Sequence, residues 1–157
     1  MKNSVRNSII EELNKKINEY VDEKCLFSGG CCFSAYVLAE YLQKCGIKYK
    51  IAIFQYMDIL NERNFTNAIN GNGVSHVAVE VVYKHKRMFI GKCDGIYNYF
   101  KMSGEKYKLH RYRGIEPIDL LSAYMGNMWN CTYDTDYNVP LINDIRAIIK
   151  KYTEIGR

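Results

Sequence analysis

The sequence has no apolar run that could cross a membrane and no apolar segment near its start. No stretch approaching 18 residues is both apolar and free of charge, which excludes a membrane-spanning helix. The opening residues lead into Glu11, Glu12, Lys15 and Lys16, where a secretory signal would have its apolar core. We therefore expect no secretory signal, no membrane partner and a cytoplasmic location.

The sequence also lacks a C-x-x-C pair, although it has 6 cysteines. They are Cys25, Cys31, Cys32, Cys45, Cys93 and Cys131. Without the spacing of paired ligands, a structural zinc site is not expected. In a reducing cytoplasm we expect these residues to be free thiols.

Low-complexity tracts, internal repeats and linkers are absent as well. The 157 residues are 48% hydrophobic and 25% charged, which is ordinary for a globular protein. This length predicts one domain with its own core, over residues 1–157. The net charge of +5 is spread over single lysines. Its densest patch, Lys84 to Arg87, is typical of an exposed hairpin turn, so nucleic acid is not an expected partner.

The first predicted helix covers residues 4–22, where apolar side chains recur at helical spacing. Ser8 to Glu11 fits a capping box, and an earlier start at Asn3 or Ser4 fits as well. Glu12 is expected on the solvent face, paired with the lysine four residues later. Nothing in this helix suggests chemistry, so we interpret it as a packing element.

Three further helices are predicted. Residues 31–45 carry one apolar face, and Gly46 is the expected stop signal. Pro117 fits the first turn of a helix over 116–129, with Ile118 on its apolar side. The last helix opens near Asn138-Val139-Pro140. Its expected buried residues are Leu141, Ile142, Ile145, Ile148, Ile149 and Tyr152.

Strand patterns are found at residues 48–56, 75–83, 87–93 and 107–113. The middle two are joined by the basic turn and predict an antiparallel hairpin. The connection over 57–74 is long for a compact domain, and we interpret it either as a lid beside a site or as a simple surface excursion. These elements together predict an α+β fold.

Cys31 is the strongest candidate nucleophile. The turn Ser28-Gly29-Gly30 delivers it onto the first turn of a helix, where the helix dipole and the unpaired N–H groups favour a thiolate. On a helical wheel Cys31 lies on the face that packs against the body of the protein. Cys32 points about 100° away, and it is the alternative nucleophile.

His76 and Asp94 complete the candidate site. His76 lies at the start of one hairpin strand, and Asp94 follows the end of the other. Pairing across the turn therefore predicts that the two are close together. A histidine base with an orienting carboxylate is the arrangement that activates a cysteine for attack on an acyl carbon.

The same residues resemble the transglutaminase-like group of papain-like cysteine enzymes. Gly29-x-Cys31-x-x-x-Ala35 resembles their nucleophile helix, and His76-x-x-Val79-Glu80-Val81 resembles their histidine strand, usually H-x-W-V-E-V. Asp94 stands about where their acid is expected. The resemblance covers residues 25 to 97 and implies a nucleophile helix, with an N-terminal helix, packed on an antiparallel sheet, followed by further C-terminal helices.

The resemblance implies a thiol-dependent acyl-transfer enzyme, foremost a cysteine hydrolase such as a peptidase or amidase, with Cys31, His76 and Asp94 as its triad. Its substrate would be a peptide, a protein or another amide or ester, and no cofactor or metal is expected. Ala78 stands where the family has tryptophan, and Cys25 where papain has glutamine. These departures fit an alternative, a catalytically inert domain of the same fold that binds a protein. The substrate and the oligomeric state stay open.

Overall fold

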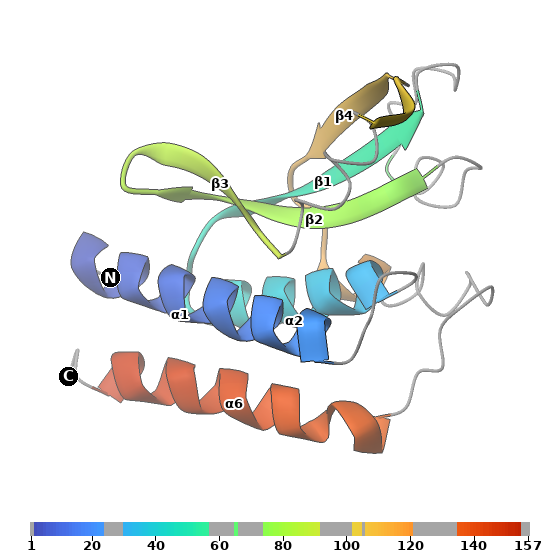
Figure 1. Cartoon of the computed structure of the whole chain (residues 1–157). Coiled ribbons are helices and arrows are strands. Elements are labelled where there is room, and N and C mark those ends of the chain that lie inside the picture. Colours follow the sequence, from blue (N-terminus) through green and yellow to red (C-terminus); the bar gives the residue numbers. More distant parts are fainter. Residues whose placement is uncertain are drawn as a thin grey trace.

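The computed structural model is an α+β fold in three layers (Figure 1). A four-stranded antiparallel sheet forms one layer, and the helices α1 (Asn3–Glu23) and α2 (Gly30–Lys44) cover one of its faces. The helix α6 (Thr135–Glu154) packs on these helices from the other side. The structure describes residues 2–23, 30–56, 65, 74–91, 102–104, 106–120 and 135–154. Within these ranges no helix is long and apolar enough to span a bilayer.

Helix α1 confirms the predicted first helix and begins at its earlier alternative start, Asn3. Its fully buried residues are Ile9, Ile10, Leu13 and Ile17. The predicted capping box at Ser8 is wrong, because Ser8 lies inside the helix and its hydroxyl donates to the Ser4 carbonyl at 3.1 Å. A hydroxyl that bonds back to the preceding turn is a common alternative to capping.

Glu12 does not lie on a solvent face with a lysine of its own helix, as the spacing predicted. Its carboxylate accepts hydrogen bonds from Lys151 Nζ, at 2.9 Å, and from the Tyr152 hydroxyl, both on α6. Lys16 pairs with Glu19 and with Asp144 of α6. This side of α1 therefore faces another helix, which the local sequence could not show.

Helix α2 ends as predicted at Gly46, which has a φ of +66°. The Ile47 amide donates to the Leu42 carbonyl, and the Gly46 amide donates to the Gln43 carbonyl, both at 2.9 Å. These two bonds form a Schellman motif, in which a left-handed residue satisfies the last carbonyls of the helix. The motif turns the chain directly into the first strand.

The strands are β1 (Tyr49–Tyr56), β2 (Val74–Tyr83), β3 (Lys86–Ile90) and β4 (Tyr107–Tyr112), in the order β3-β2-β1-β4. All neighbouring pairs are antiparallel, so the hairpin prediction is confirmed. Lys84 and His85 form its turn, with φ of 46° and 64°.

The two faces of the sheet carry different side chains. Ile51, Ile53, Val77 and Val79 belong to the main core, together with the buried residues of α1 and α2. The alternate residues Ala52, Phe54 and Ala78 form a second, smaller cluster, against which Phe89 and Leu109 pack. Because side chains alternate along a strand, this separates a helix-bearing face from an opposite face.

The C-terminal helices differ from the prediction in detail. Helix α6 begins at Thr135, so Pro140 lies within it, and Ile145 and Ile148 are buried as expected. Residues 117–120 are helical, but Leu120 is fully buried there and Ile118 is 60% exposed. The predicted apolar side was therefore wrong at Ile118.

Candidate active site

Cys31 lies in the first turn of α2, one residue after the helix begins at Gly30. It is half-buried, and it packs against the main core between the helices and the sheet. The predicted apolar face of this helix is confirmed, because Ala35, Leu38 and Leu42 are buried along it. A cysteine in this position combines partial access with the positive end of the helix dipole.

His76 is the third residue of β2, at the same end of the sheet. Helix α2 packs on β2, and its last residue, Lys44, leads by a short turn to Tyr49, which pairs with Val81. From Lys44 back to Cys31 the helix rises about 20 Å. From Val81 back to His76 the strand covers about 17 Å. Cys31 and His76 therefore lie at similar levels along the sheet, as the starts of α2 and β2 in Figure 1 also show.

The ring of His76 lies against Phe54. The two residues are partners in the β1–β2 register, and their ring centroids are 5.7 Å apart. Phe54 belongs to the cluster on the face opposite the helices. Strand alternation therefore assigns His76 to that face, whereas Cys31 packs on the helix-bearing side.

A bulge interrupts the strand immediately beside His76. Phe54 pairs with His76, but the next residue, Gln55, pairs with Val74, so that Ser75 is an extra residue in β2. Bulges bend a strand and re-aim side chains, and they are frequent next to active sites. Regular alternation thus ends at His76.

Asp94 lies outside the described residues, as does the predicted lid apart from Phe65 and Val74, the first residue of β2. Cys32 belongs to α2, but its side chain also lies outside the described part of the structure. Phe65 is buried, and its ring stacks edge-on against Tyr112 at 5.4 Å. The strand β3 ends at Ile90, opposite Val79, and at that point it runs toward the end of β2 that carries His76.

A second histidine, His110, was missed by the reasoning from sequence. It lies on β4 and pairs with Ile53, a residue of the helix-bearing face. Its neighbour Tyr112 packs against the main core on that face. The alternating pattern of the basic strand over 107–113 was a signal for His110, but no local pattern indicates that this strand pairs with β1.

Cys45 is the other free cysteine within the described part of the chain, and it lies at the opposite end of α2. It is buried, and this burial raises the pKa of its thiol above the ordinary value. We therefore expect less thiolate at Cys45 than at an ordinary exposed thiol. Among the described residues no group of three or more His, Cys, Asp or Glu side chains could hold a metal ion.

Comparisons with protein families, with curated proteins and with solved structures found no match to this chain. Functional reasoning therefore starts from the residues themselves. The arrangement brings a half-buried cysteine at a helix start and a histidine beside a bulge to one end of the sheet.

Proposed function

We propose that the protein is a thiol-dependent acyl-transfer enzyme of the papain-like, transglutaminase-like type, acting mainly as a hydrolase. The observation that carries the proposal is the placement of Cys31 in the first turn of α2, at the end of the sheet where β2 begins and where His76 is its third residue. Helix α2 packs on that same strand. This order of helix, sheet and residues is what the sequence motifs imply.

In the proposed reaction His76 takes the proton from the Cys31 sulfur, and Asp94 holds the imidazole in position. The thiolate attacks an amide or ester carbonyl, and the imidazolium returns the proton to the leaving amine or alcohol. Water, deprotonated by His76, then hydrolyses the acyl-enzyme and regenerates the thiol. The backbone N–H groups at the start of α2, including that of Cys31, would stabilise the oxyanion.

The bulge beside His76 supports the proposal in one specific way. The mechanism requires the imidazole to reach round the end of the sheet to the helix-bearing side. A strand that loses its regular alternation at this residue can direct the ring there on substrate binding, since catalytic hydrogen bonds often tighten only in the complex.

A second candidate function is a catalytically inert domain of the same fold that binds a protein. The register of His76 favours it, because alternation directs the imidazole toward Phe54 and away from Cys31. In this case Cys31 is a packing residue of the core and has the reactivity of an ordinary thiol.

The test uses p-nitrophenyl acetate as a generic acyl donor. We expect a burst of nitrophenol and one acetyl group on Cys31, located by mass spectrometry of peptides. Cys31→Ser and His76→Ala should abolish the burst, while Cys45→Ser should leave it unchanged.

His110→Ala is the matched control for the base, because His110 lies on the helix-bearing face. A burst that is lost with His110→Ala and kept with His76→Ala would reject His76 as the base. Acetylation of Cys32 with Cys31 unmodified would reject Cys31 as the nucleophile. The absence of any burst would favour the inert domain.

A further inference from the structure

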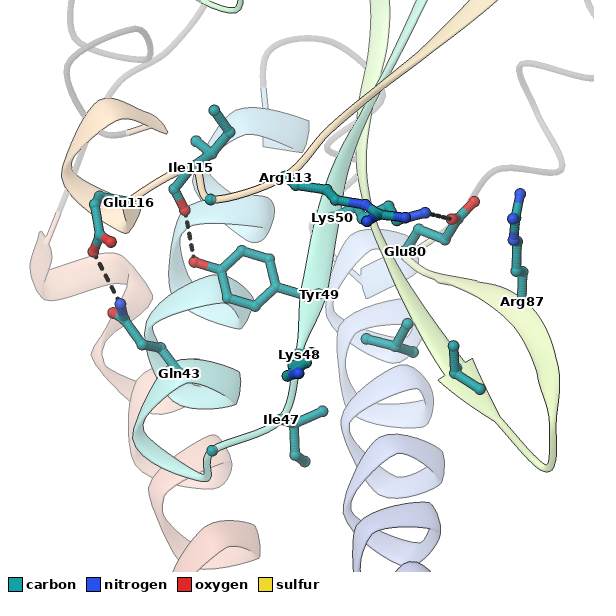
Figure 2. A pocket seen from close by; sticks show the side chains of 14 residues that line it. Gln43, Ile47, Lys48, Tyr49, Lys50, Glu80, Arg87, Arg113, Ile115 and Glu116 are labelled. Atoms are coloured by element: carbon teal, nitrogen blue, oxygen red, sulfur yellow. Dashed lines mark hydrogen bonds and ion pairs between the residues drawn. The ribbon is translucent and has the colours of Figure 1, made fainter.

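A pocket of about 820 Å³ lies at the end of the sheet away from His76. Figure 2 shows it between the turn after α2, the start of β1 and the end of β4. Its walls are formed by residues of all four strands or of the segments that flank them. A cavity of this size is in the range of small-molecule sites.

Four cationic side chains line this pocket: Lys48, Lys50, Arg87 and Arg113. Two carboxylates, Glu80 and Glu116, line it as well, so the lining residues have a net charge of +2. Figure 2 shows Arg113, Lys50, Glu80 and Arg87 following one another across the strands. Lys50, Glu80 and Arg87 alternate along their strands with residues that pack in the main core, so they lie on the sheet face opposite the helices.

Both carboxylates already have partners. The Glu80 side chain is only 4% exposed, and it accepts a hydrogen bond from Arg111 Nε at 2.6 Å. Lys50 Nζ lies 3.9 Å from the same carboxylate. Glu116 accepts a hydrogen bond from the Gln43 amide at 2.9 Å. Glu80 is thus paired mainly with Arg111, which lies outside the pocket lining, and more distantly with Lys50 of the lining.

Three cations are left over, Lys48 and the two guanidinium groups of Arg87 and Arg113. The two arginines are the ones suited to forked hydrogen bonding. Neither forms an ion pair with another residue in the described part of the chain. Both are exposed, and they approach the pocket from the two edge strands, β3 and β4. Guanidinium groups placed on two sides of a cavity are suited to bidentate binding of phosphate oxygens.

The remaining lining is apolar at Ile47, Val82 and Ile115, and Tyr49 adds an aromatic ring. Val82 is 49% exposed, which is high for a large apolar side chain on a sheet. A ligand that fits this lining has an anionic group for the arginines and a flat or apolar body for the walls. We propose that the pocket binds a small organic phosphate of nucleotide size, with Arg87 and Arg113 as the phosphate-binding residues.

The pocket is separate from the proposed active site. Glu80 lies four residues beyond His76 on β2, a distance of about 13 Å. Cys31 lies at the other end of α2 from Gly46, which lines the pocket. The proposal therefore does not depend on the acyl-transfer function, and Cys31→Ser should leave phosphate binding unchanged.

Isothermal titration of the full chain with AMP, at low and at moderate salt, tests the proposal. We expect saturable binding that weakens with salt, and no binding of adenosine, which lacks the phosphate. The double variant Arg87→Ala/Arg113→Ala should weaken AMP binding by about tenfold or more. Arg87→Lys/Arg113→Lys keeps the charge but removes the bidentate geometry, and it should give an intermediate loss.

The matched control is Lys15→Ala/Lys150→Ala, which removes the same charge from exposed positions on α1 and α6. It should bind AMP as the unchanged protein does. An equal loss in this control would show general charge attraction and overturn the proposal. No saturable AMP binding would overturn it, as would an oligonucleotide that binds tighter than AMP and whose affinity the arginine variants do not change. Circular dichroism confirms that each variant is folded.

Discussion

Arg111 on β4 reaches across β1 to the buried carboxylate of Glu80 on β2, with its Nε at 2.6 Å from the carboxylate oxygen. The residue that it passes over is Ala52, its register partner, and Ala78 lies beyond on β2. Two small side chains in adjacent strands leave the space through which the arginine extends. This ion pair joins two strands that share no backbone hydrogen bonds.

Replacing Arg111 by alanine should destabilise the protein by about 2–3 kcal/mol, because it leaves a buried carboxylate with only the more distant Lys50. Urea unfolding at pH 7 measures this loss. Adding Glu80→Leu to Arg111→Ala should recover part of it, since the unpaired charge is then removed. A double variant that is less stable than Arg111→Ala alone would contradict this account.

The hydrogen bonds from Lys151 and Tyr152 on α6 to Glu12 on α1 should make the free energy of unfolding depend on pH. Hydrogen bonds from Tyr152, and then from Lys151, hold the pKa of the Glu12 carboxyl below its ordinary value. A lowered folded-state pKa means that the stabilisation is present above the unfolded-state pKa and is lost as the pH falls through the folded-state pKa.

Glu12→Gln should therefore lower the Tm by roughly 1–3 °C at pH 7. The difference should disappear in acid, below the folded-state pKa, where the native carboxyl is also protonated. Thermal melts of both proteins from pH 7 to pH 2 measure this. Glu19→Gln, on the same helix and paired only with exposed lysines, is the control. A Tm difference between Glu12→Gln and the unchanged protein that stays constant over the whole range would refute the assignment.

Substitutions in the β2–β3 turn should raise the free energy of unfolding. Lys84 and His85 both have positive φ in a two-residue hairpin turn, a conformation that asparagine and glycine adopt with less strain. We expect Lys84→Asn/His85→Gly to raise the free energy of unfolding by about 1 kcal/mol. Lys86→Gly, in the adjacent strand, should lower it. Equal effects of the two changes would show that turn geometry is not the cause.

Leu120 and Ile118 form a matched pair two residues apart. Leu120 is fully buried, and Ile118 is 60% exposed. Leu120→Ala should cost about 2–4 kcal/mol through the cavity that it leaves, and Ile118→Ala should cost less than about 0.5 kcal/mol. Denaturant unfolding of the two variants separates them, and a larger loss at Ile118 would reverse the assigned helix phase.

The local pattern of the sequence predicted the described elements well. The apolar spacing of α1 and α2, the stop at Gly46 and the four strands depend on neighbouring residues, so each was visible in the sequence. The hairpin register also followed, because two strands joined by a tight turn can pair in few ways.

Long-range placement could not be predicted in the same way. Nothing local to β4 shows that it pairs with β1 and not with β3, so His110 was overlooked. The hydrogen bond between Lys151 and Glu12 also joins residues far apart in the chain. The same is true of the hydrogen bond between Arg111 and Glu80. For the candidate site, the sequence placed Cys31 and His76 on the correct elements. No local sequence pattern indicated the bulge beside His76, where the regular alternation of side chains along β2 ends.

The central claim is that Cys31 is activated by His76, and the pH dependence of its alkylation by iodoacetamide tests this most directly. Peptide mass spectrometry would follow the rate at Cys31 in the unchanged protein, in His76→Gln and in His110→Gln. The account predicts a midpoint below the pKa of about 8.5 of an ordinary thiol in the unchanged protein, and a clear upward shift in His76→Gln alone. A midpoint near 8.5 that is the same in all three proteins would contradict it.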